Sequence, residues 1–555
     1  MPDAPEEMPA GALEEMMMGA SLPDDGLDSG WLEPEPQIDE AEIKNSLTAD
    51  VVVVGAGVAG VCAARSAAEA GASVIVLEKT AGISARSGQF AVIGGRINEY
   101  FGRPSVDPDE VTNRIMQECS YRIKRTIISR WAHNAHKVFD WFIDVVPELY
   151  IARCSDEVIP EDKRRFHMKP LSWPLPEKYD FTKEEFPVYP NSLIFIPGHK
   201  PVLKATMKKC TEELGVQALY GFSASKLEQK NGRVCAVLAK DCQDGRYIRV
   251  TAKKGIVLAT GDNSGNPAIM THFTPGVLRK KTPVMSMKAK DTAGRFVVQN
   301  TGDGLKLGSW LGAAVQQNHA VMSHNMGRPG FLGLGNTPFL FLNKHGQRFM
   351  NENVPGQQLQ NQIELQPGRF IYQIFDDNWR EQLAYMPPNH GCVSSYDRDR
   401  PLNMMDETMS EAKFRVAIEK GAVIAADTLE ELLEKLDIDK EAALRSIARY
   451  NELARNGFDA DFNKAASRLF PIEKPPFYAS GFGLSAMLVD IGGLESDEEC
   501  RVYTNEGDIL QGLFVAGNVQ GNCYAVEYPI CIPGLSHSLC MFYGYVAGRN
   551  AAAGK

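Results

Sequence analysis

The pattern of apolar and polar residues between positions 49 and 79 predicts a β-strand, an α-helix and a second β-strand. Four consecutive valines, 51–54, form a continuous β-branched run, which is typical of a parallel strand buried on both faces. An alanine-rich stretch that ends at Gly71 predicts the helix, and residues 73–77 predict the second strand, which closes on Glu78. This order and length indicate a crossover unit with two parallel strands.

Elsewhere the pattern predicts more helices and a β-hairpin. Apolar residues at helical spacing indicate helices over 109–120, 126–142, 200–214, 439–456 and 536–552. Residues 255–258 are typical of another buried strand, and residues 232–250 of two strands that turn at Asp244-Gly245. Alternating strands and helices favour an α/β fold with a Rossmann-like parallel sheet.

Glycines follow the first strand at G-x-G-x-x-G spacing, as Gly55, Gly57 and Gly60. The first permits a tight turn, the second lets a pyrophosphate approach the backbone, and the third lets the helix pack close to the strand. The helix N-terminus offers unpaired N–H groups to the phosphates, and Glu78 stands where a carboxylate accepts hydrogen bonds from a ribose. A glycine-rich turn without a ligand is the alternative, but the complete unit favours dinucleotide binding.

The loop after Glu78 has the composition of a second nucleotide contact. Residues 80–96 combine small residues with two hydroxyls, Ser84 and Ser87, beside Gly82 and Gly88. Such a backbone suits close contact with a flat ring and a phosphate, whereas a polar surface loop is the alternative.

Charge is concentrated at the N-terminus. Residues 1–46 hold thirteen acidic residues and one basic residue, Lys44, so the net charge of this segment is −12. The whole chain has a net charge of −11, which leaves about +1 for residues 47–555. The acidic composition predicts a disordered tail, with Trp31 as a point of docking on the body. The near-neutral body argues against nucleic-acid binding, and no apolar run reaches the ~18 residues of a membrane span.

The eleven cysteines include no C-x-x-C pair, so no zinc, iron–sulfur or c-type haem motif is present and we expect no metal. Scattered thiols favour a reducing compartment, hence a cytoplasmic protein. The alternative is export through a twin-arginine signal that this sequence lacks.

Several motifs occur in order over residues 49–555: the fingerprint at 49–79, Ser84-x-x-Ser87-Gly88, Ala259-Thr260-Gly261, Thr301-Gly302-Asp303-Gly304, 346–352 (GQRFMNE), Gly492-Gly493 and 512–518 (GLFVAGN). With this ordered set the sequence resembles the fumarate reductase and succinate dehydrogenase flavoprotein family, especially its 3-oxosteroid dehydrogenase and urocanate reductase-like branches.

The resemblance implies FAD as the cofactor. Members that bind FAD covalently use a histidine in the loop after the ribose acid, and no histidine occurs before His133, so we expect noncovalent FAD. The residues expected at the cofactor are Gly55, Gly57, Gly60, Glu78, Lys79, Ser84, Ser87, Gly88, Thr260, Gly261, Asp303, Gly517, Asn518, Gly534, Leu535 and Ser536.

The resemblance also divides the chain. It implies an FAD-binding domain over 47–315, with an irregular insertion at 147–197, and a return to that domain over 481–555. An α+β capping domain over 316–480 splits the two parts and closes over the flavin in this family.

In this family a hydride from reduced flavin and a proton from the protein add across a polarised C=C bond. Fumarate-specific members use one arginine just after the R-F-x-N-E motif and another near the C-terminal glycine turn. The matching stretches here, 353–358 and 528–534, contain no arginine, so fumarate is not the expected substrate.

Three residues are candidate catalytic groups. Tyr528 resembles the tyrosine that contacts an enone oxygen in the steroid branch, and a buried structural tyrosine is its alternative. His537 is a candidate proton relay or a helix-start histidine near the flavin. Arg348 is the third, although together with Glu352 it can instead stabilise the cap.

These observations predict an FAD-dependent oxidoreductase that reduces a conjugated C=C bond in an enone or an α,β-unsaturated acid, with an external electron donor. One alternative is a 3-oxosteroid-type dehydrogenase that introduces a C=C bond and passes electrons to an external acceptor. Another is a non-catalytic flavoprotein subunit of an electron-transfer complex.

Overall fold

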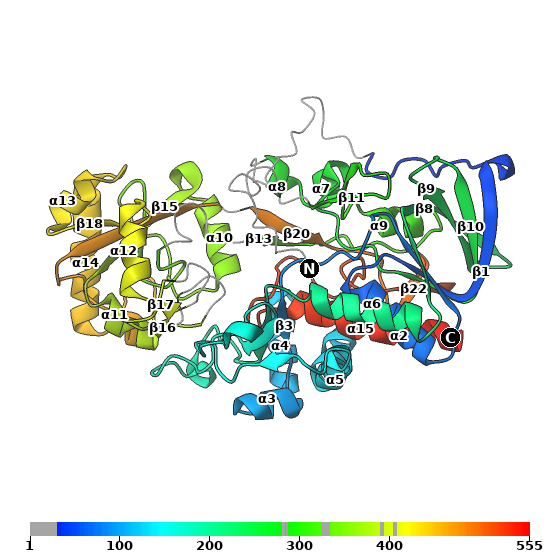
Figure 1. The fold of residues 1–555 in the computed structure, drawn as a ribbon. Coiled ribbons are helices and arrows are strands. Elements are labelled where there is room, and N and C mark those ends of the chain that lie inside the picture. The colour runs from blue at the N-terminus through cyan, green and yellow to red at the C-terminus, as the bar shows by residue number, and fades with distance from the viewer. Residues whose placement is uncertain are drawn as a thin grey trace.

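The computed structural model describes residues 30–279, 284, 287–323, 333–388, 393, 395–402, 408–484 and 486–555. Within them the chain forms a larger body, on the right of Figure 1, and a smaller one on the left. Two strands, β13 (Ala320–Ser323) and β20 (Met487–Ile491), pair antiparallel between the two bodies.

The larger body is built on an eight-stranded sheet. Five of its strands run parallel in the order β22-β10-β1-β2-β7, and these are Ile509–Val515, Tyr247–Leu258, Ile43–Val54, Val74–Glu78 and Gln217–Tyr220. Strands β8 (Phe222–Lys230) and β9 (Arg233–Asp241) continue antiparallel from β10, and β21 (Arg501–Tyr503) pairs antiparallel with β22.

The valine run of β1 separates two hydrophobic cores. Val51 and Val53 pack with the helices on one face, whereas Val52 and Val54 pack with β9, β10 and β22 on the other. Because successive side chains of a strand point to opposite faces, a strand covered on both sides needs apolar residues at every position. The run predicted as a buried parallel strand is therefore confirmed.

Helices α2 (Val58–Glu69) and α15 (Leu535–Ala553) pack tightly against each other below the sheet (Figure 1). The small residues of both helices allow this, because a Cβ atom at Gly544 would lie 2.4 Å from the Ala59 carbonyl oxygen. The five helices predicted outside the first unit are present within two residues of their predicted ends. They are α4 (Pro108–Glu118), α5 (Arg125–Ile143), α6 (Lys200–Glu212), α14 (Lys440–Asn456) and α15.

The insertion at 147–197 is more regular than predicted. Strands β4 (Tyr150–Ile151), β5 (His167–Pro170) and β6 (Ser192–Ile196) form a four-stranded sheet with β3 (Gln89–Ala91). Strands of two to five residues leave too short an alternation for the sequence to indicate them. The remaining elements of the larger body are α3 (Gly95–Phe101), α7 (Pro267–Phe273), α8 (Pro275–Arg279), β11 (Lys288–Lys290), β12 (Phe296–Val298) and α9 (Asp303–Ser309).

The smaller body combines an antiparallel sheet with helices. Its sheet has the order β14-β15-β19-β18, formed by Leu340–Asn343, Phe370–Asp376, Phe477–Gly483 and Ile424–Ala426. Its other elements are α10 (Gly356–Glu364), α11 (Trp379–Gln382), β16 (Ser395–Tyr396), β17 (Thr408–Met409), α12 (Glu411–Glu419) and α13 (Leu429–Glu434), besides α14. Strand β19 runs to Gly483, three residues past the predicted boundary at 480.

The prediction of a disordered tail up to residue 46 is wrong for residues 30–46, and residues 1–29 lie outside the described part. Strand β1 already begins at Ile43, and Trp31 packs on Phe273 with ring centroids 5.2 Å apart. Basic side chains of the body bind the acidic residues of this segment, including Arg249 with Glu40 and Lys226 with Glu35. Within residues 30–46, several acidic side chains therefore take part in ion pairs with the body.

Candidate functional site

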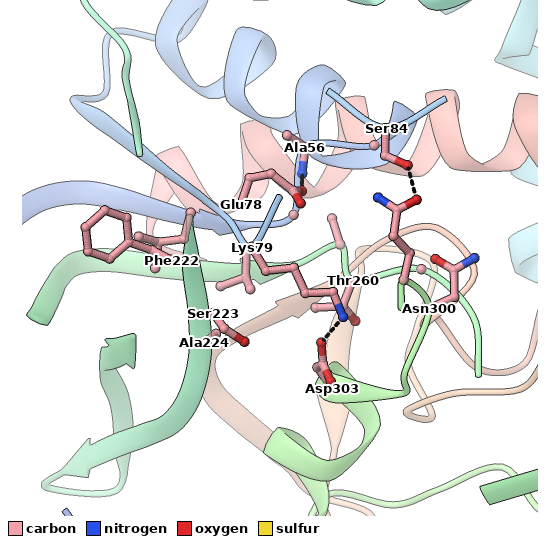
Figure 2. Close-up of a pocket in the computed structure, with 17 residues that line it drawn as sticks. Ala56, Glu78, Lys79, Ser84, Phe222, Ser223, Ala224, Thr260, Asn300 and Asp303 are labelled. Atoms are coloured by element: carbon pink, nitrogen blue, oxygen red, sulfur yellow. Dashed lines mark hydrogen bonds and ion pairs between the residues drawn. The ribbon is translucent and has the colours of Figure 1, made fainter. Parts of the chain in front are cut away.

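A cavity opens at the carboxyl ends of β1, β2 and β10, where ligands bind in open parallel sheets (Figure 2). Its lining includes eight of the residues predicted at the cofactor: Gly55, Gly57, Glu78, Lys79, Ser84, Thr260, Gly261 and Asp303. The sequence motifs that predicted these residues are far apart along the chain, and the sheet brings them to one edge.

The first two predicted roles of the fingerprint glycines are visible in the backbone. Gly55 has φ +107°, and a Cβ atom there would lie 2.4 Å from the Ala259 carbonyl oxygen. A Cβ atom at Gly57 would meet no protein atom within 4 Å, so this position faces open space beside the start of α2. That space and the N–H groups of the helix terminus fit a pyrophosphate.

Gly60 lies inside α2 and does not line the cavity. A Cβ atom at this position would be 1.9 Å from the Gly55 carbonyl oxygen. The third glycine therefore lets the helix start close to the turn, as the fingerprint requires.

Glu78 is buried at the end of β2 and joins the turn to the next loop. One carboxylate oxygen accepts a hydrogen bond from the Ala56 N–H at 2.8 Å, and the other accepts from the N–H and the hydroxyl of Thr80 at 2.8 and 2.7 Å. A carboxylate has about four acceptor sites, so it can also accept from ribose hydroxyls.

Lys79 crosses the cavity edge to the N-terminus of α9 (Figure 2). Its Nζ atom lies 2.8 Å from an Asp303 carboxylate oxygen and 2.6 Å from the Thr301 hydroxyl. Burial acts to raise the pKa of Asp303, but the charge and hydrogen bond of Lys79 outweigh it and hold the pKa below its usual value. This pair therefore stays charged and fixes α9 against the cavity.

Sequence reasoning missed five lining residues. Phe222, Ser223 and Ala224 come from the start of β8, and Gln299 and Asn300 precede α9. No motif marks them, because β8 reaches the cavity through contacts with β2 and α9 that form only in the folded chain.

The other predicted cofactor residues lie outside this cavity. Several meet at the N-terminus of α15, where the Ser536 hydroxyl donates to Asn518 Oδ1 at 3.0 Å. Gly534 has φ +86° and packs on the Phe90 backbone, because a Cβ atom there would lie 2.5 Å from Phe90 N. Leu535 follows Gly534 and is fully buried, and Gly517 lies against Ala59 of α2.

Two histidines hold the loop that contains Ser87 and Gly88. His199 Nδ1 donates to the Ser87 carbonyl and His537 Nδ1 donates to the Gln89 carbonyl, both at 2.9 Å, and the two rings are 4.9 Å apart. Burial lowers the pKa of His537 to about 4 and that of His199 far below its usual value. Both rings are therefore neutral at pH 7. No sequence motif marks His199.

Tyr528 is buried beside the start of α15. Its hydroxyl oxygen accepts a hydrogen bond from the Ser536 N–H at 3.0 Å, and its ring stacks on Tyr524 with centroids 5.3 Å apart. Burial raises the pKa of Tyr528 and outweighs the Ser536 hydrogen bond, which lowers it. The phenol is thus protonated at neutral pH and can donate a hydrogen.

Arg348 does not join this group, and its position argues against the catalytic role expected for it. Its guanidinium binds Glu352 at 2.8 Å and Asp459 at 2.6 Å inside the smaller body, between the rings of Tyr450 and Phe462. A bidentate arginine with two buried carboxylates is engaged within its own domain. The alternative role, stabilisation of the cap, fits this geometry.

The described residues provide neither a cluster of metal ligands nor a membrane-spanning helix. No group of three or more His, Cys, Asp or Glu side chains among them could hold a metal ion. No helix among them is both long and apolar enough to cross a membrane.

The fold and the cavity define a dinucleotide-binding protein of the α/β class. The chain belongs to the FAD binding domain family, whose model matches residues 50–531. This match confirms the predicted family and identifies the cofactor as FAD.

Two curated proteins and one solved structure illustrate the similarity. An NADH:acrylate oxidoreductase of Vibrio harveyi is 25% identical over 547 residues, covering 91% of this chain and 50% of that protein. A vinyl phenol reductase of Lactiplantibacillus plantarum is 26% identical over 525 residues, covering 90% of this chain and 95% of that protein. The chain therefore spans about half the length of the first relative and nearly all of the second.

The solved structure is the 3-ketosteroid-Δ4-(5α)-dehydrogenase from Rhodococcus jostii RHA1 in complex with 4-androstene-3,17-dione. It matches with a TM-score of 0.66 at 21% identity, covering 94% of this chain and 100% of that chain. At this identity the likeness shows the fold.

Proposed function

We propose that the protein is an FAD-dependent oxidoreductase that reduces a conjugated C=C bond beside a carbonyl or carboxyl group. The observation that carries the proposal is the buried, protonated Tyr528 at the N-terminus of α15, beside residues expected at the flavin. Two relatives named for acrylate and vinyl phenol support it, because both compounds carry an activated C=C bond.

We assign the larger body to a Rossmann-like FAD-binding domain and the smaller one to a capping domain. The parallel sheet with its cavity at the carboxyl edge supports the first assignment. The smaller body lies between the two parts of the larger one along the chain, which supports the second. The division is then about 30–315, 316–486 and 487–555.

The residues have distinct proposed roles. Gly57 and the start of α2 hold the pyrophosphate of noncovalent FAD, and Glu78 holds a ribose. FAD supplies the electrons and the hydride. Tyr528 donates a hydrogen bond or a proton to the substrate, and its oxygen stays positioned by the Ser536 N–H. An external reductase or reduced carrier supplies electrons to the enzyme.

The reverse reaction is a second candidate. The Tyr528-Pro529 pair before the Gly534 turn resembles the steroid branch, which favours a dehydrogenase acting on a steroid-like ketone. A flavoprotein subunit without its own substrate is the third candidate, and it predicts a bound flavin that no unsaturated compound reoxidises.

Anaerobic photoreduction separates these functions. The photoreduced protein is mixed with a panel of enones and acrylates, and flavin absorbance is followed. Reoxidation supports the reductase, and reduction of the oxidised protein by a saturated 3-oxosteroid supports the dehydrogenase. If no unsaturated compound reoxidises the flavin, the proposed reductase is wrong.

Tyr528→Phe tests the assigned donor. We expect reoxidation to slow by about 100-fold or more, because a positioned acid contributes 10²–10⁴ in rate. Tyr524→Phe is the matched control, since Tyr524 is a buried, stacked neighbour. Equal rates in the two variants would remove Tyr528 from the reaction.

A further inference from the structure

Helix α10 of the smaller body meets the loop 524–528 of the larger one. The Asn361 amide donates to a Glu527 carboxylate oxygen at 2.5 Å, across 166 positions of sequence. The Glu527 backbone also pairs with Val321 of β13. Helix α10 begins inside the stretch 353–358, and the loop 524–528 ends at the first residue of the stretch 528–534, the two stretches that the resemblance relates to substrate contacts. Asn361 and Glu527 lie just outside these stretches and are in contact.

Polar atoms on both sides of this contact have no partner among the described residues. They are the second carboxylate oxygen of Glu527, both amide atoms of Gln360, and Oδ1 of Asn353, which lies three residues before α10. Gln360 is only 2% exposed. A buried polar group left without a partner costs about 1–3 kcal/mol, so the free Glu527 oxygen and the amide of Gln360, the residue before Asn361 on α10, indicate a place for a polar ligand.

The electrostatics of the contact disfavour an anion. The pKa of Glu527 is raised to about 7, mainly by burial. The nearby carboxyls of Glu118 on α4 and Glu364 on α10 contribute to this rise, and the hydrogen bond from Asn361 opposes it. Arg114 is already paired with Glu118 at 2.9 Å, and Cys119 contacts the Glu527 carbonyl. A substrate carboxylate here would face acidic groups, and Arg114, already paired, does not offer it the bidentate contact that carboxylates prefer.

We infer that the contact between α10 and the loop 524–528 is the polar subsite for the substrate, and that it takes an uncharged hydrogen-bonding group. A carboxamide, ketone or phenol can accept from the protonated Glu527 or the Gln360 NH₂, and a carboxamide or phenol can also donate to the Gln360 oxygen. Glu527 and Gln360 are then specificity-determining residues. This inference rests on the proposed function and narrows its substrates to neutral activated alkenes.

Cinnamamide and cinnamate test it, because they have nearly the same shape and differ in charge. Binding to the oxidised holoenzyme is measured through the change in flavin absorbance. We expect cinnamamide to bind at least tenfold more tightly than cinnamate at pH 7. Equal or tighter binding of cinnamate, or binding of neither compound, overturns the inference.

Variants test the residues. Glu527→Ala should weaken cinnamamide binding about tenfold, in line with the loss of one hydrogen bond in a buried site. Glu527→Gln keeps a neutral donor, so binding should persist and lose the decline that the wild type shows as Glu527 ionises above a pH of about 7. Glu148→Gln, which changes an exposed carboxylate of the larger body, is the control and should leave the preference for cinnamamide unchanged.

The outcomes separate this inference from the function on which it rests. Reoxidation of reduced flavin by cinnamate but not by cinnamamide leaves the reductase intact and overturns the neutral subsite. A flavin that no alkene reoxidises overturns the reductase itself. Wild-type affinity for cinnamamide in Glu527→Ala removes Glu527 from the subsite.

Discussion

Two glycines of the first turn, three positions apart, have different neighbours. A methyl group at Gly57 would enter open space beside the helix terminus, whereas one at Gly60 would overlap the Gly55 carbonyl. The first position is therefore free of protein constraints and the second is not. The two roles, ligand approach and helix packing, can be separated by substitution.

We expect Gly57→Ala to fold normally and to bind FAD at least tenfold more weakly, because its methyl group occupies the space for the pyrophosphate. Gly60→Ala should lower the free energy of unfolding by about 1–3 kcal/mol, as overpacking does. Flavin titration and denaturant unfolding of the apoprotein measure the two effects. Normal FAD affinity in Gly57→Ala would contradict the placement of the phosphates.

Glu527 predicts a pH dependence of stability. Its pKa is raised from 4.5 to about 7 in the folded protein, so between these values the native state binds more protons than the unfolded state. Wild-type stability should fall as the pH rises through this window, by up to about 3 kcal/mol. Glu527→Gln lacks this loss, so its advantage should grow from pH 4.5 to 7, measured by urea unfolding at each pH. A constant difference would contradict the raised pKa.

At the scale of elements, helices were predictable from apolar residues at helical spacing, and capping residues mark the ends of some of them. Helix α14 begins after Asp439, whose side chain accepts from Ala442 N–H, and ends at Gly457 in the left-handed conformation. The short strands of the insertion and the ordered segment at 30–46 lack such signals. Their order comes from tertiary partners, such as Phe273 under Trp31.

The residues of the site also fall into those that the sequence predicts and those that it does not. The glycine turn and Glu78 were predictable because a single local unit contains both the backbone and the chemistry. Residues 222–224 and the Asn361–Glu527 contact were not, since each depends on segments that only the folded chain brings together. A sequence motif reflects the geometry of one short segment, so it cannot indicate a contact between segments that are distant in the sequence.

The segment at 30–46 should contribute through Trp31. We expect Trp31→Ala to lower the free energy of unfolding by about 1–2 kcal/mol, because it removes an aromatic contact with Phe273. Glu33→Gln is the control, since its carboxylate is exposed and pairs with Lys306 at 3.3 Å, and it should change stability by less than about 0.5 kcal/mol. Thermal unfolding measures both, and an unchanged Trp31→Ala would mean that the segment is not held there.

At the scale of the whole molecule, a buried arginine is one of the contacts that join the smaller body to the insertion, beside hydrogen bonds such as that from Lys178 N–H to the Ala384 carbonyl. Arg468 is 2% exposed and binds both oxygens of Glu184, at 2.8 and 2.5 Å. Its Nε also donates to the Tyr385 carbonyl at 2.8 Å. Removing the carboxylate leaves a buried charge with less compensation, which is strongly unfavourable.

Glu184→Gln should therefore loosen the smaller body. We expect limited proteolysis between the two bodies to be at least fivefold faster, with FAD affinity unchanged. Glu177→Gln, in the same insertion, is the control because its exposed carboxylate pairs only with the neighbouring Lys178. Identical cleavage of the wild type and Glu184→Gln would show that this ion pair does not hold the two bodies together.

Strands β13 and β20 carry the chain out of the larger body and back at neighbouring positions, with Ala320 opposite Ile491. The smaller body is therefore a continuous insertion whose two ends meet at this pair of strands. Its sequence can lengthen, shorten or be exchanged while the flavin-holding part keeps its own core and both of its halves. Diversification of substrates in proteins of this plan can thus proceed by swapping one compact piece, without redesign of the electron-carrying machinery.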